Sequence, residues 1–152
     1  MKIDLQQDLS LANEQSIEVL IKYHTMHNEV TRLQNMIQKT TATFECMLQG
    51  VKKKINIADI YYFEAVDKKS FVYCANQIYT TDLRVYQIAE KMQPYDFVQI
   101  SKSCVLNINK LASVTSLINR RTKVTLDNGE NLIVTRKYFE SIKEALEIGG
   151  LS

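Results

Sequence analysis

Residues 97–107 read FVQISKSCVLN and place a short polar step between two runs of strand-forming residues. Positions 97–100 are rich in aromatic and β-branched side chains, and apolar character returns at positions 105–106. The step between these runs consists of Ser101, Lys102, Ser103 and Cys104. Hydroxyl and ammonium groups supply hydrogen-bond donors and positive charge together, which suits a loop that faces phosphate. The alternative is an ordinary turn whose serines and lysine are merely solvated, so the rest of the chain has to decide.

The composition indicates a soluble globular protein. Of the 152 residues, 45% are hydrophobic, and the mean hydropathy is -0.19. This length suits one domain, or one domain with a short appendage. The apolar runs are too short to cross a bilayer, and the N-terminal MKIDLQQD lacks the basic-then-apolar order of a secretory signal. We therefore expect a cytoplasmic protein without membrane insertion.

The sequence offers no pattern of a metal site. Cys46, Cys74 and Cys104 are odd in number and widely spaced, which argues against both a disulfide framework and a zinc site. His24 and His27 lie three residues apart, a spacing that permits shared ligation, but no cysteine or third histidine accompanies them. We expect no metal and no cofactor.

Catalytic motifs are missing from the sequence as well. It has no glycine-rich phosphate loop, no GxSxG and no HExxH. Two acid pairs, Asp59 with Glu64 and Asp127 with Glu130, are of the right type for acid–base chemistry, but most of them lie near expected turns, where acids are ordinarily solvated. We predict that the chain is not an enzyme. A small-molecule-binding module stays open, because pockets in β-domains leave little trace in sequence.

The positive charge is unevenly distributed. The chain carries a net charge of +2, yet residues 1–50 hold six acids against four bases. Residues 101–137 hold seven bases against two acids, so the charge gathers around the polar step described above.

Residues 1–50 are predicted to form a small α/β appendage. Partial alternation indicates strands at residues 2–7 and 16–23, and another strand is expected at 41–48. Between them, apolar residues at helical spacing predict an amphipathic helix over residues 26–37. Its apolar stripe can dock on a neighbouring sheet or on a second copy of the protein.

Residues 51–152 are predicted to form a mainly β domain with flanking helices. Helices are expected at 83–92, capped by Thr81 or Asp82 and ended by Pro94, and at 136–148, ended by Gly149-Gly150. The turn signal Asp127-Asn128-Gly129 predicts that the last two strands pair as a hairpin. Besides the two runs quoted first, strands are expected at residues 60–66, 70–75, 78–81, 113–118, 122–126 and 131–134, with short helical turns at 57–59 and 107–111.

Three segments together resemble the LytTR DNA-binding domain of bacterial transcriptional regulators. They read INIADIYYFEAVDKKSFVY, FVQISKSCVLNINKL and VTLDNGENLIVTRKYFESIKEAL, and they occur in the expected order over about residues 51–147. Residues 1–50 are too short for the receiver domain that many members carry. The chain is therefore similar to the small stand-alone LytTR regulators with a short N-terminal extension, which in this chain is a candidate dimerisation element.

The resemblance implies an elongated domain of packed antiparallel β-sheets that binds double-stranded DNA through loops. Carried over by position, the residues that face DNA are Lys68, Lys69, Ser101, Lys102, Ser103, Arg136 and Lys137. Lys102 stands where some relatives have an uncharged amide, and Gln99 stands where arginine is common, so the base preference stays open.

The chemistry of these side chains suggests separate roles. Arg136 offers a planar fork for guanine O6 and N7, whereas the lysines and serines suit phosphate oxygens. Arg120 and Arg121, at an expected hairpin tip, either face DNA or are merely solvated. The aromatic residues at 61, 63, 71 and 73 are interpreted as core rather than as a base-stacking platform.

The resulting hypothesis is a homodimeric, sequence-specific transcriptional regulator that binds duplex DNA. Its rival is a protein-interaction or ligand-sensing module that controls a partner without binding DNA.

Overall fold

The structure is a computed structural model that describes residues 1–13 and 17–148. The chain divides into two compact units, Met1–Asn35 and Met36–Ser152. The helix α1, Asn28–Thr41, begins in the first unit and ends in the second.

The first unit does not contain the strands that its sequence predicts. Residues 2–7 and 17–23 are irregular, and Ser16 lies outside the described residues. Leu5 and Ile17 are 92% and 86% exposed, so the alternating apolar pattern has no sheet to pack against. Two short strands without a third strand or a covering helix gain too little burial to be stable. The expected helix does form, shifted towards the C-terminus, with Val30 buried and Met36 54% exposed.

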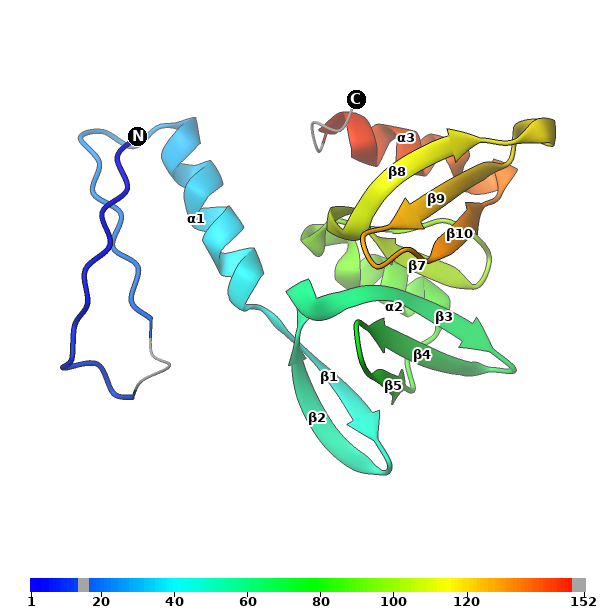
Figure 1. The fold of residues 1–152 in the computed structure, drawn as a ribbon, viewed down its shortest axis with the longest axis horizontal. Coiled ribbons are helices and arrows are strands. Elements are labelled where there is room, and N and C mark those ends of the chain that lie inside the picture. Colours follow the sequence, from blue (N-terminus) through cyan, green and yellow to red (C-terminus); the bar gives the residue numbers. More distant parts are fainter. Residues whose placement is uncertain (14–16, 149–152) are drawn as a thin grey trace. The chain divides into compact units, whose positions relative to one another are not determined.

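A seven-stranded antiparallel sheet dominates the second unit (Figure 1). Its spatial order is β2-β1-β5-β4-β3-β7-β6. Because β1 pairs with β2 along its whole length, the compact unit begins before residue 51, the boundary that the sequence suggested. The strands are β1 Thr43–Leu48, β2 Val51–Asn56, β3 Ile60–Val66, β4 Lys69–Cys74, β5 Ile78–Thr81, β6 Phe97–Gln99 and β7 Cys104–Asn107.

The helix α2, Val85–Met92, covers one face of this sheet. Ile88 and Met92 are fully buried against side chains of the central strands, including Phe63 and Val72. The predicted cap at Thr81 or Asp82 is wrong, because Arg84 is the capping residue and its amide donates to Gln87 Oε1 at 2.8 Å. The side chain of Thr81 instead accepts a bond from the Leu83 amide, in the segment that leads into the helix. Pro94 follows α2 within a short 3-10 turn, Gln93–Tyr95.

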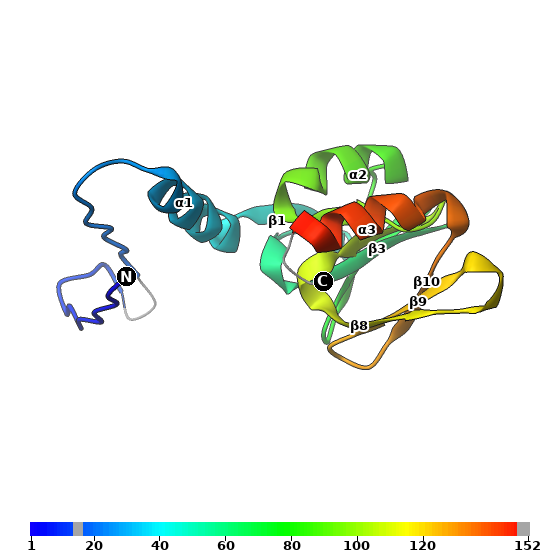
Figure 2. The ribbon, with the colours of Figure 1, turned by 90° about the horizontal axis from the view of Figure 1, so that it is seen from above.

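A three-stranded sheet packs on the opposite side of β3 from α2 (Figure 2). It consists of β8 Leu111–Ser116, β9 Thr122–Leu126 and β10 Asn131–Val134, in the order β10-β9-β8. The predicted hairpins β8–β9 and β9–β10 are both confirmed. The chain continues through a 3-10 turn, Arg136–Tyr138, into α3, Phe139–Ile148, and the expected stop at Gly149-Gly150 lies outside the described residues.

Adjacent residues of β3 serve the two cores. Phe63 packs on the α2 side, whereas Tyr62 packs on the β8–β10 side together with Leu106 and Val124. Phe63 and Tyr61 are buried and Tyr73 packs half-buried against the second core, which agrees with their interpretation as core. Phe71 is half-buried and belongs to neither core cluster. The predicted fold class, mainly β with antiparallel sheets and few helices, is confirmed.

Candidate nucleic-acid interface

The first candidate loop is the two-residue turn that joins β3 to β4. Val66 pairs with Lys69, so only Asp67 and Lys68 lie between the strands, with φ angles of 50° and 68°. Positive φ at both positions is the geometry whose twist matches a hairpin, but it favours Asn or Gly at the second position rather than Lys. The chain therefore tolerates local strain to place an exposed ammonium group at this tip, and such strain is common at functional sites. Lys69, also exposed, is the first residue of β4.

The second candidate loop joins β6 to β7. The Ser103 amide donates to Ser101 Oγ at 3.3 Å, and the two hydroxyl oxygens are 3.5 Å apart. The side chain of Gln99, the last residue of β6, donates to the Ser101 carbonyl at 3.0 Å and so ties the loop to the strand. Both serines are half-buried and Lys102 is exposed between them. The two hydroxyl groups thus close a tight turn whose apex is a lysine.

The third candidate loop lies between β10 and α3. Arg136 and Lys137 are exposed residues of the 3-10 turn that follows Thr135. Arg136 Nε donates to the main-chain carbonyl of Asn119 at 2.8 Å. The ammonium group of Lys137 lies 5.6 Å from the centre of the Tyr138 ring.

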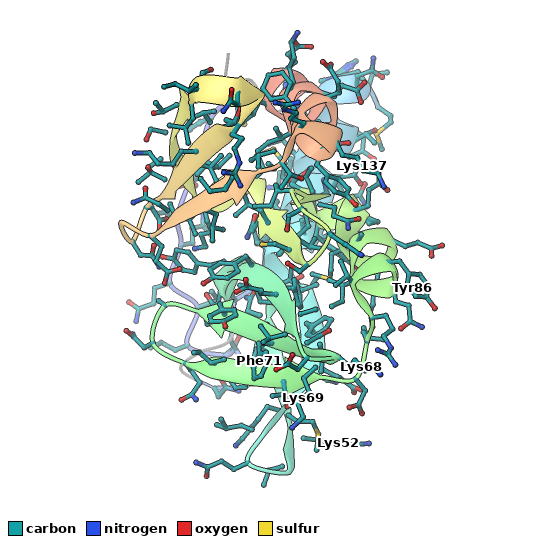
Figure 3. The ribbon with its side chains drawn as sticks, turned by 90° about the vertical axis from the view of Figure 1, so that its right-hand side faces the viewer. Lys52, Lys68, Lys69, Phe71, Tyr86 and Lys137 are labelled. Carbon is teal, nitrogen blue, oxygen red and sulfur yellow. The ribbon has the colours of Figure 1, made fainter. Side chains whose placement is uncertain are left out.

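Main-chain hydrogen bonds bring these three loops together. The Ala65 amide donates to the Ser103 carbonyl at 2.8 Å, which joins the end of β3 to the second loop. The Thr135 amide donates to the Ile100 carbonyl at 3.0 Å, which joins the second loop to the third. We call the combined surface of residues 67–69, 101–103 and 136–137 the loop edge. Figure 3 shows Lys68, Lys69 and Lys137 on the side that faces the viewer.

The loop edge is defined by the three loops that carry the seven residues proposed from the sequence. Five of them are basic and exposed: Lys68, Lys69, Lys102, Arg136 and Lys137. Among the residues that form the edge, Asp67 is the one acid, so the potential is positive and suits an anionic partner.

Residues 51–147 match the family model of the LytTr DNA-binding domain. The chain belongs to the LytTR family. The match spans the seven-stranded sheet from β2 onward, the three-stranded sheet and nearly all of α3, so the whole loop edge lies inside the LytTR domain.

Two relatives are similar to most of this chain. An uncharacterized HTH-type transcriptional regulator of Staphylococcus aureus is 31% identical over 94 residues, which are 62% of this chain and 63% of the relative. The sensory transduction protein LytT of Bacillus cereus is 24% identical over 140 residues, covering 89% of this chain and 57% of the relative. The chain thus spans about three fifths of the length of these relatives.

A solved structure has the same fold. The LytTr DNA-binding domain of a putative methyl-accepting/DNA response regulator from Bacillus cereus superposes with a TM-score of 0.64 at 20% identity. The superposition covers 70% of this chain and 97% of that chain.

The cysteine next to the loop edge is a packing residue of the LytTR domain. Burial, and secondarily the carboxylate of Glu64, raise the pKa of the Cys104 thiol far above its ordinary value. Burial also raises the pKa of Cys74, the last residue of β4, to about 11. Both thiols are therefore protonated at neutral pH, and neither has the character of a reactive cysteine.

Sequence reasoning missed Lys52 as a neighbour of the loop edge. The lysines at 52–54 were expected to follow a strand, but they belong to β2 itself. Strand pairing aligns four side chains on one face of the sheet, in a row formed by Lys52, Met47, Thr80 and Phe71. Figure 3 shows Lys52 on the same side as Lys68 and Lys69. Lysines on an edge strand also discourage edge-to-edge pairing, a structural reason for their presence that needs no binding partner.

The structure has a further hollow away from the loop edge. A cavity of about 490 Å³ opens where β2 and β4 end, and its lining includes Tyr61, Cys74, Tyr79 and Lys110. The ammonium group of Lys110 lies 4.8 Å from the centre of the Tyr61 ring.

Across the described ranges, no three side chains of His, Cys, Asp or Glu gather as a metal site would need. Nor does any helix in the described part of the chain have the length and apolar character to cross a bilayer.

Proposed function

We propose that this LytTR protein is a sequence-specific transcriptional regulator that binds double-stranded DNA with its loop edge. The observation that carries the proposal is the assembly of three basic loops by the Ala65–Ser103 and Thr135–Ile100 main-chain bonds. Loops held by a sheet scaffold can enter a groove with little loss of conformational entropy on binding. Helix α2 is separated from both α1 and α3 by strands, so the described chain offers loops rather than a helix pair as the reading element.

The side chains of the loop edge divide into one reading group and several positioning groups. Arg136 reads a guanine, because its guanidinium can bind O6 and N7 together. Lys68, Lys69, Lys102 and Lys137 contact phosphates, and the hydroxyl groups of Ser101 and Ser103 donate to phosphate oxygens. The phosphate contacts fix the register, and the guanine contact supplies the discrimination.

The protein acts in the cytoplasm as a homodimer and without catalysis. Support for the dimer comes from α1, an amphipathic helix whose apolar Met36 is 54% exposed. A second copy would cover such an apolar face, and a symmetric dimer would bind two half-sites one helical turn apart, about 34–36 Å.

Selection of binding sites from a random duplex pool tests this function. The full chain is expected to enrich a short motif that occurs twice at helical spacing, and to bind the enriched duplex far more tightly than a scrambled one. Arg136→Ala protein serves as the control and is expected to lose most of this preference. Failure of the wild-type protein to enrich any motif would overturn the proposal.

A further inference from the structure

The tip of the β8–β9 hairpin has an unusual construction. The Leu117 amide donates to the Arg121 carbonyl at 2.7 Å and closes the tip. Within it, Asn119 has a φ of 67° and a ψ of 32°, the left-handed conformation. Asn is among the few residues besides Gly that adopt this conformation readily, so the sequence is suited to hold the tip in one shape.

A hydrogen bond joins this tip to the loop edge. Arg136 Nε lies 2.8 Å from the main-chain carbonyl oxygen of Asn119. The bond uses one of the five N–H groups of the guanidinium, and the two terminal nitrogens carry the other four. Those two nitrogens are the pair that can bind guanine O6 and N7 end-on. A base held by Arg136 would therefore lie within a few ångströms of the tip.

The tip itself has side chains that suit a duplex. Arg121 is exposed, two residues beyond Asn119, and Ile118 is 87% exposed. Two residues span at most about 7 Å, which is comparable to two base-pair steps of roughly 3.4 Å each, and the tip turn shortens this reach. Arg121 can therefore reach a phosphate that flanks the base at Arg136. Charged hairpin tips are often merely solvated, but this one is bonded to the residue that we assign to base reading.

We propose that residues 117–121 form a fourth DNA-contacting element. In this arrangement Arg121 binds a phosphate beside the guanine, and Asn119 is a positioning residue that fixes the guanidinium plane of Arg136 through its carbonyl group. The inference rests on the proposed function, because it needs a duplex at the loop edge. It enlarges that interface from three loops to four and gives the β8–β9 hairpin a use beyond packing.

The test compares Arg121→Ala with Lys110→Ala, each made in the full chain. Lys110 is a control for the loss of one positive charge, because it directly precedes the other end of β8, a strand of six residues, about 20 Å long at 3.3 Å per residue. The probe is the duplex that wild-type protein enriches from a random pool, together with its scrambled version. Arg121→Ala is expected to weaken binding to both duplexes by roughly five- to tenfold and to lower the salt slope by about 1. Lys110→Ala is expected to leave affinity and slope unchanged.

A second pair of variants tests the positioning role. Asn119→Val places a β-branched residue at positive φ and is expected to reduce discrimination between the two duplexes, whereas Asn119→Gly keeps the conformation and restores it. Thermal unfolding of each variant shows whether the substitution changes only the hairpin tip or destabilises the whole domain.

The outcomes distinguish this inference from the function on which it rests. If Arg136→Ala loses discrimination while Arg121→Ala binds with wild-type affinity and salt slope, the fourth element is overturned and the function stands. If Asn119→Val discriminates as well as Asn119→Gly, the positioning role is overturned. If wild-type protein enriches no motif, the function fails and this inference fails with it.

Discussion

Two tight turns of the LytTR domain each contain a residue at positive φ, but the two turns use different residue types there. The β9–β10 turn, at the end of β9 away from the hairpin tip, uses Gly129 at a φ of 88°. The β3–β4 turn, on the loop edge, uses Lys68 at a φ of 68°. Glycine adopts positive φ without strain, whereas a lysine there costs of the order of 1 kcal/mol. Of these two turns, the one away from the loop edge has the relaxed residue, and the one where we place DNA has the strained residue.

The largest expected effect is at Arg136. Arg136→Ala should lower discrimination between the enriched and scrambled duplexes by about 1 to 3 kcal/mol, or roughly 5- to 150-fold, because the bidentate guanine contact is lost. Arg136→Lys is the sharper control, since it keeps the charge and removes the planar fork. Titrations of both duplexes measure the effect. Equal discrimination by wild type and Arg136→Ala would assign base reading to another residue.

Lys102 should behave as a phosphate contact. Lys102→Ala is expected to weaken binding to both duplexes alike, by roughly fivefold, and to lower the salt slope by about 1. Affinities measured over a series of salt concentrations give the slope. A selective loss for the enriched duplex alone would show that Lys102 reads a base instead.

Paired substitutions in the two turns address the comparison directly. Lys68→Gly should stabilise folding by up to about 1 kcal/mol and weaken DNA binding, because strain and a phosphate contact are lost together. Gly129→Ala should destabilise folding by about 1 kcal/mol and leave DNA affinity unchanged. No atom lies within 4 Å of a Cβ built on Gly129, so backbone strain is the whole cost. Urea unfolding measures the stability and DNA titration measures the affinity. If both substitutions changed the folding stability in the same direction, the proposed difference between the two turns would be wrong.

The smallest expected effect concerns the thiols. Because the pKa of Cys74 is raised to about 11, its thiolate is present below that pH only as a small fraction, roughly 1 in 10⁴ at pH 7. The pKa of Cys104, beside the loop edge, is raised as well. Alkylation of the folded protein at pH 7 should therefore be slow at both sites, and DNA affinity should not change. Mass spectrometry over time measures the rates. Fast labelling of Cys104 would indicate a reactive thiol at the loop edge.

Much of the fold could be predicted from local sequence. The strands β3 to β10 lie between clear turn signals such as Asp67-Lys68 and Asp127-Asn128-Gly129, and their positions agree with expectation to within a few residues. The strand β2 was missed because VKKKIN shows no alternation on an exposed edge. The strands expected in residues 2–23 had an alternating pattern but no partner, which a local pattern does not show.

The residues of the candidate site were proposed from the sequence, but their assembly could not be. The polar step at 101–103 stood out by composition, and Arg136 by resemblance. The bonds that unite the loops join main-chain atoms of residues far apart in sequence, Ala65 with Ser103 and Thr135 with Ile100. Main-chain groups carry no residue-specific signal, so these contacts leave no trace in sequence. The bond from Arg136 to the carbonyl of Asn119 is hidden for the same reason.

These same long-range bonds have a consequence during protein synthesis. The first loop leaves the ribosome well before Ser103 can accept its bond, and the second loop waits for Thr135. A nascent or truncated chain that ends before β10 contains the first two loops and the bond that joins them, but it lacks the third loop. If the loop edge binds DNA as proposed, only a chain translated almost to its end has the complete edge.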